Sequence, residues 1–497
     1  MGVSNSLETI DRAVFGVVQA RHLLSRAGFG GTPAQVQALV DMGLDDAVDR
    51  LVDFERIDNS DLPAVQIDPD IIRPPTREER QMMRSARKSD DKQSMADVQM
   101  RRQMSRREDR GQLGRLQRWW LSRMIATSRP MQEKLALLWH GHFACNYRTV
   151  RDSNLLYRQN EHFRTHAAGS FADLARGIVR DPAMIRFLDN HNNRKQKPNE
   201  NLARELMELF TLGEGNYSER DIKQGARALT GYTFQDNEFR FAPRMHDDGA
   251  KTILGRRGNF DGDDFVDICL EQKACSRFVA YKLYRHFVGD VDYDLLEETP
   301  VARGVIHQLS RIVLSNDYEM GPVLKRVLKS RHFYDPAVIG NKIKSPAQLI
   351  VGTVRMLDVP LRDLDSLVDA MNLMGQALFN PPSVAGWAGG RSWINTSTLF
   401  VRHNACAFLI CGKRPGDQTW ATDRIEYDPM FLLEDLPQRT PEAIVDHLLS
   451  ILLGPKVPEE RRRQLLTFLA ARSGPIKRGT IVGLLLLITA MPEYQLC

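Results

Sequence analysis

The sequence predicts a mainly α-helical protein, with a multi-helical body and short extended or hairpin excursions. Apolar residues recur at helical spacing through most of the chain. The pairs Thr32-Pro33 and Ser345-Pro346 place a capping residue before a proline, as at many helix starts. By contrast, the stretch 232–258 alternates aromatic and polar residues and is rich in turn formers, which predicts a hairpin.

A helical hairpin at 198–234 is the most regular part of the sequence. Asn199 is a good N-cap, and Gly213 stands where a left-handed C-cap is expected. Ser218 opens the second helix, with Asp221 three residues later as a variant capping box. We expect that helix to close at Gly231, after a tight turn between the two helices.

The first of these helices carries a polar stripe. Asn201, Arg204, Glu205 and Glu208 fall within an arc of about 100° on a helical wheel. Because Glu205 and Glu208 are three residues apart, both carboxylates can reach one point, where they could bind a metal or share acid–base work. The alternative is a solvated helix face on which Arg204 pairs with Glu208.

Two histidines follow the helix that we expect to begin at Pro130. His140 and His142 would point about 200° apart on a straight helix and could not share a metal. They could converge if Gly141 ends the helix. The alternative is that each is a hydrogen-bonded histidine at a helix end.

Two loops add candidate site residues. The excursion after the helical hairpin holds His246, Asp247 and Lys251. A later loop, dense in Gly, Pro and Trp, holds Trp387 and Trp393, whose packing would fix its shape. This loop could wall a pocket for a sugar or another planar substrate.

The chain divides into four expected segments. A helical segment covers 1–75, a charged helical or mobile insertion covers 76–115, a main body with the site covers 116–413, and a C-terminal helical segment packs on it over 414–497. The insertion is basic, but acidic residues interrupt it and no aromatic platform is interleaved. Nucleic acid is therefore an unlikely partner.

Composition sets further bounds. The net charge of +5 over 497 residues says little about partners. The longest apolar run, Ile481–Met491, is too short to span a bilayer. No secretory signal is evident at the start, so a cytoplasmic location is the default expectation. The cysteines form no CxxC pair, which favours reduced thiols and leaves Cys269–Cys275 or Cys406–Cys411 bridges open.

Several segments together resemble one bacterial family, domain of unknown function 1800. They are HLLSRAGFG, WHGHFA, NRKQKPNENLARELMELFTLGEGNYSERDIKQGARALTGY, HDDGAKTILG, FNPPSVAGWAGGRSWIN and MPEYQ, in order over nearly the whole chain. The resemblance implies a mainly helical fold with no assigned biochemistry. Relatives often carry export signals, and their genes often neighbour those of domain of unknown function 1501, which resembles phosphatases and sulfatases.

The family's motif positions coincide with the candidate residues. They are His140, His142, Asn199, Glu200, Asn201, Arg204, Glu205, Glu208, Gly213, His246, Asp247, Lys251, Trp387, Trp393 and Asn395. This clustering favours a functional site over a solvated helix face.

The first hypothesis is a metal-dependent hydrolase. Imidazoles and carboxylates suit zinc, iron or manganese, which would activate a water molecule. The expected metal ligands are His140, His142, His246, Glu205 and Glu208. The expected catalytic residues are Glu205, Glu208, Arg204 and Asp247, and the expected substrate contacts are Asn199, Asn201, Lys251, Trp387, Trp393 and Asn395. A metal-free variant would use a buried Glu205 or Glu208 with a raised pKa as general acid.

The second hypothesis is a non-enzymatic binding or assembly protein. The partner implied by the resemblance is the phosphatase- or sulfatase-like protein of domain of unknown function 1501. The polar residues of the helical hairpin would then hold loops in place.

Overall fold

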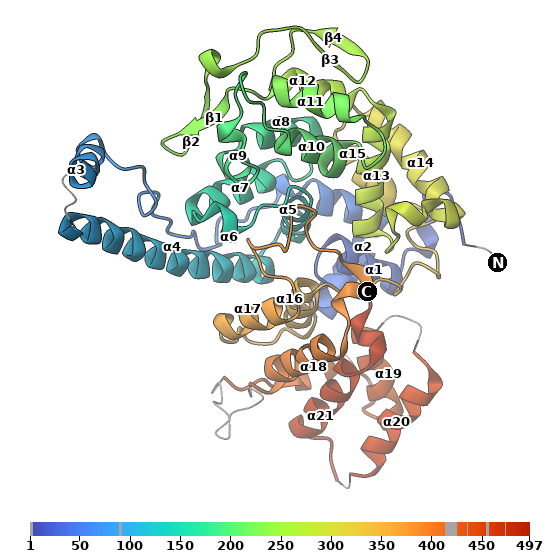
Figure 1. The fold of residues 1–497 in the computed structure, drawn as a ribbon. Coiled ribbons are helices and arrows are strands. Elements are labelled where there is room, and N and C mark those ends of the chain that lie inside the picture. The colour runs from blue at the N-terminus through green and yellow to red at the C-terminus, as the bar shows by residue number, and fades with distance from the viewer. Residues whose placement is uncertain (1–2, 89–91, 413–424, 435, 454–456, 473) are drawn as a thin grey trace.

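Helices dominate the computed structural model, as predicted (Figure 1). The structure describes residues 3–88, 92–412, 425–434, 436–453, 457–472 and 474–497. Within these residues, the sheets are two antiparallel pairs of short strands. The mainly α fold class is therefore confirmed.

The chain begins with two packed helices, α1 (Val17–Ala27) and α2 (Pro33–Val52). The Thr32 side chain accepts the amide hydrogen of Gln35, and Pro33 occupies the first turn, as the sequence predicts. Together these residues fix the direction in which α2 leaves the loop.

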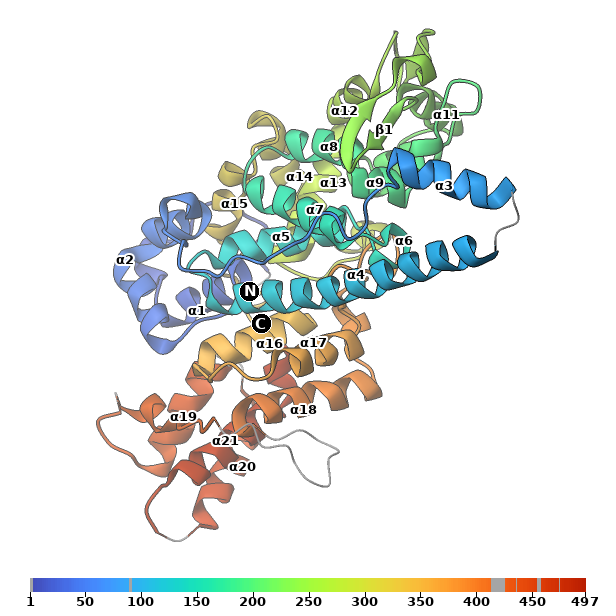
Figure 2. The same cartoon turned by 90° about the vertical axis from the view of Figure 1, so that its left-hand side faces the viewer.

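The charged segment is a pair of helices that projects from the body in both views (Figures 1 and 2). It consists of α3 (Arg77–Lys88) and α4 (Lys92–Ala126), which contact each other. The far end of α4 enters the core, where Trp120 and Met124 are fully buried. The boundary that we expected between 115 and 116 therefore falls inside α4, because one continuous helix serves both the projection and the core.

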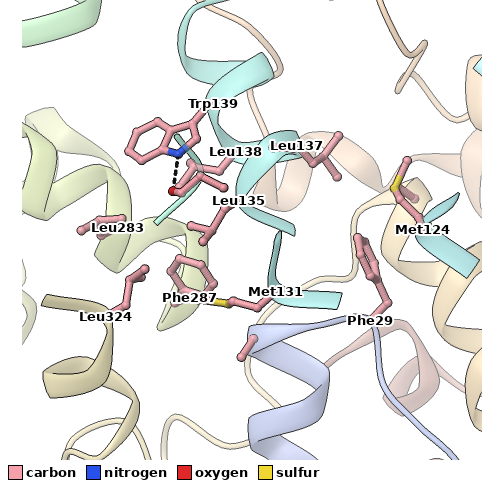
Figure 3. Packing of buried hydrophobic residues seen from close by; sticks show 14 of the residues in the cluster. Phe29, Met124, Met131, Leu135, Leu137, Leu138, Trp139, Leu283, Phe287 and Leu324 are labelled. Atoms are coloured by element: carbon pink, nitrogen blue, oxygen red, sulfur yellow. Dashed lines mark hydrogen bonds between the residues drawn. The ribbon is translucent and has the colours of Figure 1, made fainter. Parts of the chain in front are cut away.

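Helix α5 (Pro130–His142) lies at the centre of the body. It starts at Pro130 as predicted, and every residue in it except Gly141 is buried. A helix that is apolar nearly all round must be enclosed by others, here α1, α2, α4 and α7. Figure 3 shows apolar residues of α5 packed among Phe29, Met124, Phe287 and Leu324. Trp139 donates a hydrogen bond of 2.9 Å to the carbonyl of Ala167.

Helices from the middle of the chain cover α5 and extend the body. They are α6 (Tyr147–Val150), α7 (Ser153–Thr165), α8 (Phe171–Arg180), α9 (Pro182–Phe187), α10 (Asn201–Glu205), α11 (Glu219–Ala228), α12 (Gly262–Leu270), α13 (Lys273–Phe287), α14 (Pro300–Ser315) and α15 (Met320–Leu328). One continuous cluster of buried apolar residues joins them to α5.

The predicted helical hairpin is present, but its first helix changes type. After α10, residues Leu206–Thr211 form a π-helix, η4, which the sequence analysis did not anticipate. Gly213 and Gly231 have φ of 79° and 81°, as expected for left-handed positions. Ser218 and Asp221 form the expected capping box of α11.

The predicted hairpin excursion follows. Strand β1 (Tyr232–Gln235) pairs with β2 (Glu238–Phe241), and β3 (Lys251–Ile253) pairs with β4 (Arg256–Gly258). The β1–β2 turn consists of Asp236 and Asn237, which both have positive φ, the pattern of a two-residue hairpin turn. Figure 2 places these strands at the end of the molecule farthest from the C-terminal helices.

The C-terminal helices form the opposite end of the molecule (Figure 2). They are α16 (Pro346–Leu357), α17 (Leu364–Leu373), α18 (Thr396–Cys411), α19 (Pro441–Leu452), α20 (Glu459–Ala470) and α21 (Arg478–Thr489). The boundary expected after residue 413 lies outside the described residues. Helix α18 packs on both α16 and α21, so it links the C-terminal segment to the body.

The six cysteines are free thiols, so neither of the two bridges left open by the sequence is formed. Within the described part of the chain, no helix is both long enough and apolar enough to cross a bilayer.

Candidate functional site

A partly open pocket of about 160 Å³ lies where α5, α13 and two loops meet. Helix α5 contributes Lys134, Gly141 and His142, which are spaced so that they share one helix face. Helix α13 contributes three basic residues at i, i+3 and i+4, which are Lys282, Arg285 and His286. We call this hollow the cationic pocket.

The loop that holds Trp387 and Trp393, which we call the tryptophan loop, forms one wall of the cationic pocket, as the sequence predicts. Trp387 and Trp393 both line it. Gly386 has a φ of 78°, and a Cβ atom there would lie 2.0 Å from the carbonyl oxygen of Gly141. This close approach of loop and helix requires glycine at 386.

His140 anchors the same loop from behind. Its Nε2 accepts the amide hydrogen of Phe379 at 3.1 Å, and its ring lies 5.5 Å from that of Trp387. Burial lowers the pKa of His140 to about 3, so the ring is neutral. His140 therefore positions the wall of the pocket.

The cationic pocket carries more positive than negative charge. Asp290 is the one acidic side chain among the described residues that line it, and it pairs with Lys342 at 2.7 Å. No carboxylate of the described residues lies within 4 Å of the charged nitrogens of Lys134, Lys282 or Arg285. The site therefore has three cations without an acidic partner.

The two unpaired lysines rest on aromatic rings. The Lys134 Nζ atom lies 5.0 Å from the Phe29 ring centre, and Lys282 Nζ lies 4.7 Å from that of Phe278. Such contacts contribute about 0.5–2 kcal/mol each, less than the several kcal/mol that removing an ammonium from water costs. The rings therefore offset only part of the penalty.

Burial shifts the pKa values of these lysines. It lowers the pKa of Lys134 to about 7, and Cys497 acts more weakly in the opposite direction. Burial and then the charge of Arg285 lower the pKa of Lys282 to about 8. An anion nearby would therefore stabilise the charged form of both ammonium groups and raise both pKa values.

Three buried nitrogen atoms of the pocket's lining residues have no hydrogen-bond partner among the residues that the structure describes. They are Nδ1 of His142, Nε2 of His286 and Nε1 of Trp387. Native proteins leave few such groups unpaired, and each costs about 1–3 kcal/mol. The pocket is thus polar, positively charged and incompletely satisfied.

The carboxylate pair lies on α10 and η4. Glu208 accepts a hydrogen bond of 2.6 Å from the Tyr217 hydroxyl. Arg204 does not pair with Glu208, since it forms a two-pronged ion pair with Glu219 and a longer contact with Glu200. The pKa of Glu205 is raised by burial and then by the charge of Glu208, as the metal-free general-acid variant would need.

The excursion holds a separate network. His246 Nδ1 donates a hydrogen bond to the Thr230 carbonyl at 2.8 Å. The Arg227 guanidinium donates to both carboxylate oxygens of Asp247. Arg227 lowers the pKa of Asp247. The buried Lys251 donates to the Asp247 carbonyl. These contacts fix the strands to α11.

Of the predicted asparagines, only Asn395 is a helix N-cap; the N-cap of α10 is Glu200, one residue after the predicted Asn199. Asn199 Oδ1 accepts the amide hydrogen of Asn201 at 3.0 Å, and Asn201 is exposed at the start of α10. Asn395 Oδ1 accepts the amide hydrogen of Thr398 at 2.9 Å. Asn395 therefore caps the start of α18, directly after the tryptophan loop.

The expected five-residue metal centre is not assembled. Within the described residues, no three His, Cys, Asp or Glu side chains are placed to hold a metal ion together. Helix α5 continues through Gly141, so His140 and His142 point to different sides of it, and His246 is held in the excursion. Of the predicted site residues, the structure brings His142, Trp387 and Trp393 into one pocket.

The sequence analysis missed the lysines and arginine of the cationic pocket. A signal for them exists, because Lys134 is the one lysine or arginine in the mostly apolar helix 130–142 and the basic residues of α13 share one face. What could not be seen is that these two faces, about 150 residues apart in sequence, meet.

Fold and site together define a helical protein with a positively charged, tryptophan-walled pocket. Comparison with known families shows that residues 22–496 match the family described as Protein of unknown function (DUF1800). The chain belongs to this family. No curated protein and no solved structure matches the chain.

Proposed function

We propose that the protein binds a small anionic ligand in the cationic pocket. The observation that supports this is the convergence of the buried Lys134 and the half-buried Lys282 and Arg285 on one hollow, with no carboxylate of the described residues within 4 Å of their charged nitrogens. Buried charges in proteins are normally paired or bind a ligand of opposite charge. The ligand would supply the missing partner.

The contrast with another buried charge in the same helix strengthens the argument. Glu133, next to Lys134, is fully buried and contacts Arg123 and Arg164, and Trp120 donates to it. The fold thus surrounds the Glu133 carboxylate, which lies outside the pocket, with charged and hydrogen-bonding partners. For Lys134, whose side chain lines the pocket, it provides an aromatic ring but no Asp or Glu side chain of the described residues within 4 Å.

The experiment is calorimetric titration of the full chain with phosphate and sulfate at low ionic strength. Lys282→Met should weaken binding of the anion roughly 10- to 100-fold, because it removes a charge-assisted contact. Lys223→Met is the matched control, since Lys223 is an exposed lysine on α11 outside the pocket. Equal losses in both variants, or no binding by the wild type, would refute the proposal.

Two earlier predictions remain open beside this one. Hydrolysis of an anionic substrate, with or without a divalent metal, would be tested by turnover of phosphate and sulfate esters and by the metal content of protein purified without a histidine tag. Assembly with a phosphatase- or sulfatase-like protein would be tested by co-purification. The geometry supports anion binding more directly than either.

A further inference from the structure

We propose that the cationic pocket selects an oxyanion that carries its own O–H donor, such as hydrogen phosphate, over one without a donor, such as sulfate. This inference rests on the proposed function. It depends on the hydrogen-bonding state of His142, whose Nδ1 atom is a buried acceptor without a donor in the described structure.

The tautomer of His142 follows from its surroundings. Its Nε2 atom lies 3.0 Å from the carbonyl oxygen of Phe210 in η4. A carbonyl oxygen can only accept, so Nε2 carries the hydrogen. Burial and then the nearby Lys282 hold the pKa of His142 well below its usual value, so the ring is neutral. Nδ1 is therefore left with a lone pair and no hydrogen.

This Nδ1 atom is an acceptor without a donor. It is buried, and it has no hydrogen-bond partner within the described structure. His142 is 5% exposed and lines the pocket. Around it, the ammonium groups of Lys134 and Lys282 and the indole N–H of Trp387 can only donate.

A ligand that satisfies these groups must therefore offer oxygen acceptors to several donors and one hydrogen to the Nδ1 atom of His142. Hydrogen phosphate meets both conditions, because one of its four oxygens bears a proton at neutral pH. Sulfate has nearly the same size, shape and charge, but all four oxygens are bare. Bound sulfate would place an oxygen lone pair against the lone pair of Nδ1 and leave this acceptor unpaired.

The test compares four tetrahedral anions by calorimetric titration of the full chain at about pH 8. Phosphate and arsenate carry a hydroxyl there, whereas sulfate and selenate do not. We expect phosphate and arsenate to bind roughly tenfold more tightly than sulfate and selenate, because a buried acceptor left unpaired costs about that much. The comparison needs no variant and so does not depend on one folding.

His142→Phe supplies the second measurement. Phenylalanine keeps an aromatic ring among Phe143, Phe171 and Phe210, which all lie near His142, but lacks the acceptor. The preference for phosphate over sulfate should fall to near one in this variant.

The outcomes separate the two proposals. Equal affinity for the four anions, or a preference for sulfate, would overturn the selectivity and leave anion binding in place. An unchanged preference in a folded His142→Phe variant would also overturn it. Failure of all four anions to bind would overturn both.

Discussion

Replacing Lys134 by methionine should stabilise the ligand-free protein while it weakens anion binding. Methionine has nearly the same length and shape as the apolar part of lysine, so it can pack beside Phe29 without an ammonium group. The side chain is 4% exposed and has no acidic partner among the described residues. The substitution therefore removes an uncompensated buried charge.

The size of the effect follows from the pKa. Burial lowers the pKa of Lys134 from 10.5 to about 7. A shift of about 3.5 units at 1.36 kcal/mol each gives an upper bound of about 5 kcal/mol. Losing the cation–π contact offsets about 0.5–2 kcal/mol, which leaves roughly 3–4 kcal/mol. With an unfolding entropy of about 2.1 cal/mol/K per residue, the 497 residues give a Tm rise of about 3–4 °C.

The effect should depend on pH with a definite sign. Below about pH 7, Lys134 is charged in both states, and the wild type carries the whole penalty. Between about 7 and 10.5, the unfolded state binds a proton that the folded state lacks, so wild-type stability rises with pH. The stability difference between the variant and the wild type should therefore be constant below about pH 7 and disappear near 10.5.

Differential scanning calorimetry of both proteins from about pH 6 to 10, in buffer without phosphate or sulfate, measures this difference. Added phosphate should raise the Tm of the wild type more than that of Lys134→Met, because it binds the folded wild type more tightly. A variant that is less stable at every pH, by a constant amount, would refute the reasoning. Lys134 would then be a packing residue and not a buried charge awaiting an anion.

Three other predictions concern the same region. Anion binding at about pH 8 should take up protons, because Lys134 and Lys282 have pKa values of about 7 and 8 when the pocket is free. The binding enthalpy measured by calorimetry should then vary with the ionisation enthalpy of the buffer. A binding enthalpy that is the same in all buffers would contradict this. Glu133→Gln should lower stability by about 1.5–3 kcal/mol in denaturant unfolding, because Arg123 loses its charged partner and the buried Arg164 keeps only the more exposed Glu161, and a loss below about 1 kcal/mol would contradict it. Gly386→Ala should weaken phosphate binding and change tryptophan fluorescence with little loss of secondary structure, since the added Cβ would push the tryptophan loop away from α5. Unchanged fluorescence and unchanged phosphate affinity would contradict this.

The regular parts of the fold could be predicted because their signals are local. Thr32, Ser218 and Gly213 act through neighbours within a few residues, and each is found where the sequence placed it. The π-helix η4 escaped prediction because its amphipathic pattern over a few residues is almost the same as that of an α-helix.

The candidate site could be predicted only in part. The tryptophan loop was expected to wall a pocket, and it does. The carboxylate stripe gave a strong pattern, yet Glu208 pairs with Tyr217 and Arg204 with Glu219. A helical wheel shows which residues share a face, but it cannot show what that face meets.

By itself, the amino-acid sequence determined the helices, their caps, the hairpin excursion and the family, because each depends on short-range geometry or on an ordered set of motifs. The tertiary structure alone decided where the unpaired charges gather. Lys134 and Lys282 lie on helices far apart in the chain, and their ammonium groups share one pocket only because α5 and α13 pack together beneath the tryptophan loop. Electrostatic interactions act through space, so the meeting of two charged helix faces from distant parts of the chain has no signature along the sequence.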